Sequence, residues 1–218
     1  MSEPLERAPV IVFDLDGTLV DSLTDIVVSF RQAFGELGLD QPEEEAVKAL
    51  IGRPLDEMYA RFAPAARVAA LSASYRRHYP KNFTRNSRIF PGVADVLTEL
   101  RRRGNRLAVA TTKRTEMALA LVEATGIASY LDHVQGTDDF PHKPAPDVVL
   151  RAAAAVGGSP AWMVGDTTAD IEAGRAAGAA TYAVTWGTHD EATLAGARPD
   201  LLEPDLSRLL EVTRTAIR

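Results

Sequence analysis

The stretch that decides the fold is VIVFDLDGTLVDS, residues 10–22. Its apolar beginning ends in two aspartates, Asp14 and Asp16, which a single leucine separates. An apolar run of this kind is typical of a central strand in a parallel sheet that helices cover on both faces. Two neighbouring carboxylates at the end of such a strand repel each other, and a divalent cation such as Mg²⁺ would neutralise them. Gly17 allows a tight turn after them, and the hydroxyl of Thr18 can hydrogen-bond the adjoining loop.

The pattern of a strand followed by a polar turn recurs along the chain. Helical segments alternate with these runs, and the alternation predicts an α/β fold with a doubly wound, mostly parallel sheet. Ligands of such sheets bind outside the carboxyl ends of the strands, so the polar residues that close each strand are site candidates. We predict strands at 106–112, 161–166 and 181–187, and helices at 93–104, with Gly104 as C-cap, and from Thr115, Pro146 and Asp170.

Residues 22 to about 90 interrupt this alternation with helical patterns alone. Ser22 with Asp25 predicts a variant of the capping box at the start of the first helix. Apolar residues then follow helical spacing, and further helices are predicted at 43–52, 54–63 and 65–79. We therefore expect an all-helical cap domain, residues 21–87, inserted into a core formed by residues 1–20 and 88–218.

The composition is that of a globular protein. The 218 residues are enough to bury a substantial core, and the net charge of −6 argues against nonspecific binding to nucleic acid or to an anionic membrane. The absence of cysteine excludes disulfides, thiolate zinc sites and a cysteine nucleophile. The first residues lack the apolar segment of a signal peptide, and no apolar run approaches the length of a membrane span. We expect a cytoplasmic monomer or homodimer.

A second pair of carboxylates, Asp166 and Asp170 in GDTTAD, follows the strand predicted at 161–166. The fold would bring this pair to the same sheet edge as Asp14 and Asp16. Taken alone, each pair has a structural explanation: turn residues in the first case, and acidic residues at a helix N-terminus in the second. Two such pairs at strand ends favour a site for a hard cation.

Two further polar residues belong to the same series. Thr111 closes the strand predicted at 106–112, where its hydroxyl and the following amides can bind a phosphoryl oxygen. Threonine is also common in strands and at helix N-caps. Lys143 lies between Pro141 and Pro144, which stiffen the loop and limit where the ammonium points. A lone lysine is usually a solvated charge, and the place of Lys143 in this series is what makes it a candidate.

These motifs, in this order, resemble the haloacid dehalogenase superfamily of phosphohydrolases. DLDGT, a strand-end threonine, a lysine before a proline and GDxxxD are similar to its four motifs, and the similarity extends over nearly the whole chain. DLDGTLVDS, FPGV, HKPAPD and AGRAAGA resemble its phosphoglycolate phosphatase-like group, which carries a helical cap inserted after the first motif.

The resemblance implies a role for each motif residue. Asp14 would be the nucleophile that forms an aspartyl-phosphate, and Asp16 the general acid that protonates the leaving oxygen and then activates water. Thr111 would bind the transferring phosphoryl group, and Lys143 would hold Asp14 and a phosphoryl oxygen together. Phosphoryl transfer needs positioning and charge compensation more than elaborate covalent chemistry, which suits these residues.

The resemblance also implies a Mg²⁺ cofactor. Its ligands would be Asp14, the backbone carbonyl of Asp16, and Asp166. Asp170 would ligate the metal directly, ligate it through water, or orient Lys143, and the sequence does not choose among these.

Substrate contacts beyond the motifs are expected from two positions. Thr112 stands where close relatives often have Asn, which changes the hydrogen bonding of the phosphate loop. Arg53, on a turn between two predicted helices, is placed to reach a substrate carboxylate or second phosphate, and is equally well explained as a solvated turn residue. The basic run Arg76, Arg77, His78 and Lys81 predicts a solvated helix face, whereas Trp162 and Trp186 are expected in the core.

The leading hypothesis is a Mg²⁺-dependent phosphatase whose partner is a small phosphorylated metabolite such as 2-phosphoglycolate. A phosphomutase would share the aspartyl-phosphate but pass the phosphoryl group to a second sugar phosphate, and a pyrophosphatase or nucleotidase would differ only in substrate. A different class of function is a signalling module that accepts phosphate on Asp14, as response-regulator receivers do. Receivers lack a helical cap over the site, and their acidic pair does not have the DxDGT form. Because no motif residue is missing, a noncatalytic interaction protein is disfavoured.

Overall fold

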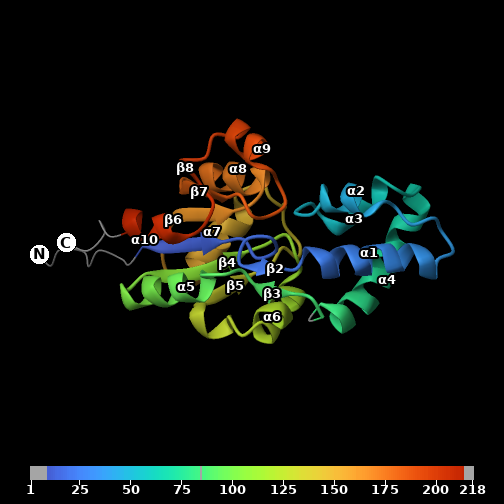
Figure 1. Ribbon diagram of the computed structural model, residues 1–218, viewed down its shortest axis with the longest axis horizontal. Coiled ribbons are helices and arrows are strands. Elements are labelled where there is room, and N and C mark those ends of the chain that lie inside the picture. Colours follow the sequence, from blue (N-terminus) through green and yellow to red (C-terminus); the bar gives the residue numbers. More distant parts are fainter. Residues whose placement is uncertain (1–8, 84, 214–218) are drawn as a thin grey trace, which may run out of the picture.

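The core of the protein is a six-stranded parallel sheet, seen in a computed structural model that describes residues 9–83 and 85–213 (Figure 1). This sheet confirms the predicted α/β class. Its strand order is β5-β4-β1-β6-β7-β8, so the first strand lies in the middle, between β4 and β6. The strands are β1 (Val10–Phe13), β4 (Arg106–Ala110), β5 (His133–Gln135), β6 (Pro160–Gly165), β7 (Ala180–Val184) and β8 (Leu201–Glu203).

Strand β1 is buried on both faces, as its unbroken apolar run predicts. Ile11 and Phe13 pack with one core cluster, whereas Val10 and Val12 pack with another on the opposite face. The first cluster includes helices α5 (Val93–Arg102), α6 (Thr115–Ala124) and α10 (Ser207–Val212), and the second includes α7 (Asp147–Ala155) and α8 (Thr168–Ala176).

Two edge strands of this sheet were not predicted. Strands β5 and β8 have three residues each, which is too short for an alternating or continuous apolar pattern to stand out. They occupy the two edges of the sheet, where hydrogen bonds to β4 and β7 define them. Short elements η1 (Ala128–Tyr130) and α9 (Glu191–Gly196) precede them.

Four helices gather at one end of the molecule, as expected from the helical patterns between residues 22 and 90 (Figure 1). An aromatic cluster joins the first and third of them: the ring of Phe30 stacks on that of Tyr59 with centroids 4.0 Å apart, and Phe34 packs against both. The helices are α1 (Leu23–Glu36), α2 (Glu44–Lys48), α3 (Leu55–Ala60) and α4 (Ala65–Asn82).

The chain enters and leaves this helical group through a two-stranded antiparallel pair, β2 (Val20–Asp21) with β3 (Arg88–Ile89). We propose that this pair is the hinge between a core of residues 1–20 and 88–218 and a cap of residues 21–87. No described helix is long and apolar enough to cross a membrane.

The capping box predicted for Ser22 and Asp25 is wrong. Ser22 is the N-cap of α1, but its side chain makes no capping hydrogen bond and instead donates to Asp16 Oδ1 at 2.5 Å. Asp25 accepts four hydrogen bonds from the backbones and side chains of Asn86 and Ser87. Ser22 therefore contacts the loop after β1, and Asp25 contacts the segment before β3, instead of capping the helix end.

Candidate active site

The strand-end residues converge at the carboxyl edge of the sheet. Asp14 follows β1 and Asp166 follows β6, and because these strands are neighbours the two carboxylates come together. Asp170, from the first turn of α8, completes a buried group in which one carboxylate oxygen of each residue lies within 4.8 Å of the others. The second carboxylate pair thus meets Asp14 of the first pair, at the sheet edge that the fold class predicts.

Lys143 contacts two of these three carboxylates. Its Nζ is 2.6 Å from Asp14 Oδ1, 2.6 Å from Asp170 Oδ1 and 3.0 Å from the carbonyl oxygen of Ala110. Burial alone would lower the pKa of Lys143, but Asp14 and Asp170 outweigh it and raise the pKa above its ordinary value. The ammonium is therefore charged at neutral pH and compensates one of the carboxylates.

Among the described residues, Lys143 is the cation that forms ion pairs with this group, and it compensates only part of the negative charge. Burial raises the pKa of Asp14 well above its usual range; Lys143 opposes the rise, whereas Asp170 and Asp166 add to it. Burial and the neighbouring Asp170 raise the pKa of Asp166 to about 6. Three buried carboxylates beside one ammonium leave an excess of negative charge that suits a divalent cation with oxygen ligands.

Glycines make the room for these carboxylates. A Cβ atom at Gly17 or at Gly187 would lie 2.3 Å from Asp166 Oδ2, and one at Gly165 would lie 2.3 Å from Asp170 Cβ. Thr18 Oγ1 and the backbone N–H of Thr188 donate to the two oxygens of Asp166, both at 2.7 Å. This cradle and its oxygen donor set fit a Mg²⁺ ion.

Asp170 is held from both sides. Its Oδ1 accepts from Lys143, and its Oδ2 accepts from the backbone N–H and the hydroxyl of Thr167, at 3.0 and 2.6 Å. Thr167 and Asp170 form a capping box at the start of α8, so the helix-terminus explanation of GDTTAD also holds. Of the options left open by the sequence, this geometry supports the one in which Asp170 orients Lys143.

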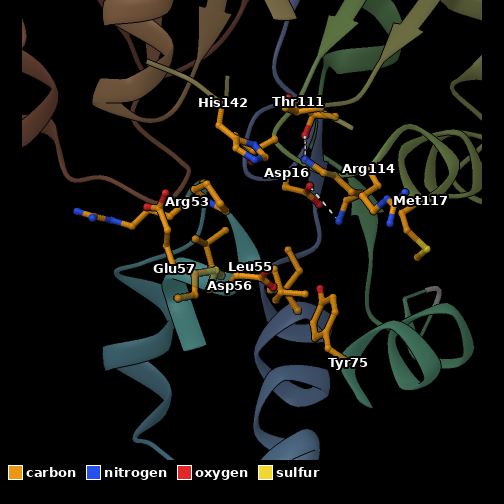
Figure 2. A pocket seen from close by; sticks show the side chains of 18 of the residues that line it. Asp16, Arg53, Leu55, Asp56, Glu57, Tyr75, Thr111, Arg114, Met117 and His142 are labelled. Carbon is orange, nitrogen blue, oxygen red and sulfur yellow. Dashed lines mark hydrogen bonds and ion pairs between the residues drawn. The ribbon is translucent and has the colours of Figure 1, made fainter. Parts of the chain in front are cut away.

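Asp16 faces a cavity of about 420 Å³ rather than the carboxylate group (Figure 2). Its Oδ1 accepts from Ser22, and its Oδ2 lies 3.1 Å from the Nζ of Lys113. Both aspartates of DLDGT line the cavity, but Asp14 is paired with Lys143 and Asp16 with Lys113.

Lys113 is the residue that the sequence interpretation missed. It follows Thr111 by two positions, in the loop between β4 and α6, and its Nζ also donates to the hydroxyl of Tyr79 on α4 at 3.0 Å. The sequence feature that could have identified Lys113 was its position just beyond the end of a predicted strand, at the same edge of the sheet as the other candidates.

The other predicted site residues line the same cavity. Thr111 is buried, and its Oγ1 accepts from the backbone N–H of Lys113 at 3.2 Å; Thr112 is half-buried beside it. Arg53 lies on the turn between α2 and α3 and is exposed; it lines the cavity, but its side chain points away from Thr111 and Asp16 (Figure 2). His142 also lines the cavity, and its buried Nδ1 has no hydrogen-bond partner among the described residues.

The expectation of a solvated basic helix face is partly wrong. Arg77 and His78 contact Glu36 on α1, and Arg76 lines the cavity with a nitrogen 3.7 Å from Asp56 Oδ1. Lys81 is exposed. Both tryptophans pack on the core, as expected: Trp162 edge-on to Tyr182, and Trp186 stacked on Phe90.

Comparisons with known proteins agree with the motifs. The family described as haloacid dehalogenase-like hydrolase matches residues 11–184. The chain is 35% identical to a probable phosphatase IndB of Dickeya dadantii, over 96% of this chain and 95% of that one. It is 34% identical to a phosphoglycolate phosphatase of Aquifex aeolicus, over 82% and 85% of the two chains.

A solved structure shows the same architecture. The predicted phosphoglycolate phosphatase from Haemophilus somnus superimposes with a TM-score of 0.86 at 28% identity, covering 97% of this chain and all of the other. With the family pattern spanning most of the sheet and the relatives spanning nearly all of the chain, this protein belongs to the haloacid dehalogenase-like hydrolases and resembles the phosphoglycolate phosphatases among them.

Proposed function

We propose that this protein is a Mg²⁺-dependent phosphatase of small phosphomonoesters that works through an aspartyl-phosphate on Asp14. The observation that carries the proposal is the contact of Lys143 with Asp14 Oδ1 inside a group of three buried carboxylates. A carboxylate attacks a phosphate ester only if the repulsion between them is offset, and this site concentrates the charges that offset it.

In the first step, the carboxylate of Asp14 attacks phosphorus. Lys143 holds Oδ1, so the attacking atom is Oδ2. A bond forms between Oδ2 and phosphorus while the bond from phosphorus to the leaving oxygen breaks, and Asp16 gives its proton to that oxygen.

In the second step, Asp16 takes a proton from a water molecule, and the water oxygen attacks the phosphorus of the aspartyl-phosphate. The bond to Oδ2 breaks, which releases inorganic phosphate and restores the Asp14 carboxylate. The hydroxyl of Thr111 and the ammonium of Lys143 hold the phosphoryl oxygens through both steps.

Mg²⁺ would be held by Asp14, the backbone carbonyl of Asp16, and Asp166. When bound, it supplies positive charge that draws the phosphate and the carboxylate of Asp14 together. Asp170 keeps the ammonium of Lys143 aimed at Asp14.

The cavity of about 420 Å³ suits a small substrate, and 2-phosphoglycolate is our leading candidate. The phosphoglycolate phosphatase relative supports this choice. Arg53, at the mouth of the cavity, is available to a substrate carboxylate or second phosphate.

The test is phosphate release from 2-phosphoglycolate, sugar phosphates, nucleotides and pyrophosphate, with and without Mg²⁺. Release should need Mg²⁺ and should fall at least about 10³-fold in Asp14→Asn, because the nucleophile is lost. The exposed Asp40→Asn is the matched control and should keep wild-type activity. Full activity in Asp14→Asn would refute the proposal.

The same assay separates the alternative functions. Isomerised sugar phosphate without net release would indicate a phosphomutase, and a long-lived aspartyl-phosphate without turnover would indicate a signalling module.

A further inference from the structure

Lys113 is a buried cation in the cavity wall that the proposed reaction does not use. Its side chain is 10% exposed, and it lies between the core residue Asp16 and Tyr79 of α4. The ammonium also lies over the Tyr79 ring, 4.3 Å from its centroid. Burial alone would lower the pKa of Lys113, but Asp16 and its neighbours raise it, so the side chain is positively charged.

The hydrogen bonds of Lys113 leave room for a ligand. An ammonium has three donors, and the structure shows two side-chain acceptors for it within the described residues, Asp16 Oδ2 and the hydroxyl of Tyr79. Because Lys113 lines the cavity that Asp16 faces, the third donor is available to a molecule bound there.

The distance between Lys113 and Asp16 indicates which part of a bound substrate the ammonium of Lys113 would contact. In the proposed reaction the leaving oxygen lies within hydrogen-bond reach of Asp16, and Lys113 Nζ is 3.1 Å from that same carboxylate. A group carried by the atom bonded to the leaving oxygen therefore falls beside Lys113. The transferring phosphoryl group lies on the other side, against Lys143 and Thr111.

The other cations of the cavity are less well placed for this contact. Arg76 and Arg114 each lie near a carboxylate of their own, Asp56 at 3.7 Å and Asp138 at 3.8 Å, and Arg53 is exposed on the cap turn. Lys113 is the one of these four whose ion pair is with Asp16 itself.

We propose that Lys113 recognises the leaving group by binding an anion, a carboxylate or a second phosphate, carried next to the leaving oxygen. The enzyme then prefers substrates of the type phosphate–O–CH₂–COO⁻ or phosphate–O–phosphate over esters of neutral alcohols. This inference rests on the proposed phosphatase function and adds the substrate class.

The experiment compares matched substrates in wild type, Lys113→Met and Lys113→Arg. 2-Phosphoglycolate and 2-hydroxyethyl phosphate have leaving groups of similar size, one anionic and one neutral, and pyrophosphate tests the second anion. Loss of a charge-assisted hydrogen bond should lower kcat/KM for the anionic substrate about 100-fold in Lys113→Met, against about 5-fold for the neutral one. Lys113→Arg should retain most of the preference because it keeps the charge.

The substrate ratio separates specificity from a role in positioning Asp16. Both esters need a proton at the leaving oxygen, so a lysine that only positions Asp16 would lower both rates equally, and that result would overturn the inference. A selective loss with 2-phosphoglycolate or with pyrophosphate supports it and identifies which anion is bound. If wild type releases phosphate in an Asp14-dependent way but the ratio does not change in Lys113→Met, the inference fails while the phosphatase function stands. If wild type hydrolyses none of these three compounds, the inference fails, and the phosphatase function fails as well only if sugar phosphates and nucleotides are not hydrolysed either.

A measurement on wild type covers the case in which Lys113→Met does not fold. Glycolate should inhibit hydrolysis of 2-hydroxyethyl phosphate at concentrations at least about tenfold lower than ethylene glycol, because only glycolate offers a carboxylate to Lys113. Equal inhibition by the two compounds would contradict the inference.

Discussion

Asp14 and Asp16 are almost adjacent in sequence but have opposite surroundings. A spacing of two residues would place both side chains on the same face of a strand, but β1 ends at Phe13 and the chain turns at Gly17, so that Asp14 joins the buried carboxylate group whereas Asp16 does not. Each has its own lysine, Lys143 for Asp14 and Lys113 for Asp16. Each of the two like charges that repel as neighbours is thus compensated by a different ammonium.

The protonation of Asp166 predicts how the affinity for Mg²⁺ depends on pH. Burial and Asp170 raise its pKa to about 6 in the free protein, so below pH 6 a proton competes with the metal for the carboxylate. The Kd for Mg²⁺, measured by calorimetry, should rise about tenfold or more from pH 7.5 to pH 5. The raised pKa of Asp14 acts in the same direction. Asp166→Asn, which cannot bind that proton, should bind Mg²⁺ weakly and show a smaller pH dependence; a wild-type Kd equal at both pH values would count against the site.

A second prediction concerns Gly17, in the turn that follows the two aspartates. Gly17 has φ +84°, and an added Cβ would lie 2.3 Å from Asp166 Oδ2. Gly17→Ala should therefore displace Asp166 and weaken Mg²⁺ binding, in addition to costing about 1–2 kcal/mol of backbone strain. Gly104 has φ +83° with no atom within 4 Å of an added Cβ, so Gly104→Ala isolates the strain. Thermal unfolding and Mg²⁺ titration of both variants check this, and equal Mg²⁺ affinities in the two would be inconsistent with the cradle.

At the scale of elements, the start of α1 is tied to the segment before β3 by one side chain. Burial would raise the pKa of Asp25, but the four hydrogen bonds from Asn86 and Ser87 prevail and lower it below its ordinary value of 3.8. The carboxylate therefore holds together the two chain segments that run between the sheet and the helical group.

Asp25→Asn should lower the free energy of unfolding by about 1–3 kcal/mol at pH 7, because the amide places donors against donors. A lowered pKa means that the contribution of Asp25 is present above the unfolded pKa and is lost as the pH falls through the folded one. The difference between wild type and variant in urea unfolding should thus be constant from pH 7 to 5 and shrink below about pH 4. Asp21→Asn, an exposed neighbour in β2, should change stability little at either pH. A difference that does not vary with pH would show that the charge of Asp25 is not what matters.

At the scale of the whole molecule, the cavity lies between the helical group and the sheet edge. Its walls come from both, with Arg53 and Tyr75 on one side and Thr111 and Arg114 on the other (Figure 2). Entry and release of substrate therefore depend on how far the proposed cap moves about β2 and β3.

A disulfide across this boundary should slow turnover. A Cβ at Gly52 would lie 3.9 Å from Thr167 Cβ, which is within the Cβ separation of disulfides, about 3.5–4.5 Å. The chain has no cysteine, so the double variant Gly52→Cys with Thr167→Cys would form a single defined bond. We expect the oxidised protein to have a kcat at least about tenfold below that of the same protein after reduction, because product release needs an open cap.

The reduced double variant carries the same substitutions, so the comparison isolates the bond from the strain at Gly52, whose φ is +98°, and from the altered capping of α8. The two single variants under the same oxidising conditions are further controls. Equal rates before and after reduction would show that turnover does not require this part of the cap to move.

How much the sequence could predict follows from which interactions are local. The run that ends at Asp14 and the alternation of strands with helices predicted the parallel sheet and its carboxyl edge, because both depend on neighbours along the chain. The positions of Asp166 and Asp170 at that edge followed from the same alternation, whereas Lys143 became a candidate through its place in the series of motifs. The three-residue strands β5 and β8 could not be predicted, because pairing with β4 and β7 rather than their own pattern defines them.

The sequence by itself determined the fold class, the family and the set of motif residues, since strand periodicity and the spacing of DLDGT, HKPAPD and GDTTAD are local properties. Tertiary packing was needed to show that Ser22 binds Asp16 and Asp25 binds Ser87 instead of capping α1, and that Lys113 joins Asp16 to Tyr79. These partners lie far apart in the chain or on separate elements, and a buried polar group takes whichever partner packing brings within reach. The sequence shows which polar side chains need hydrogen-bond partners. The packing of the helical group against the sheet edge selects those partners.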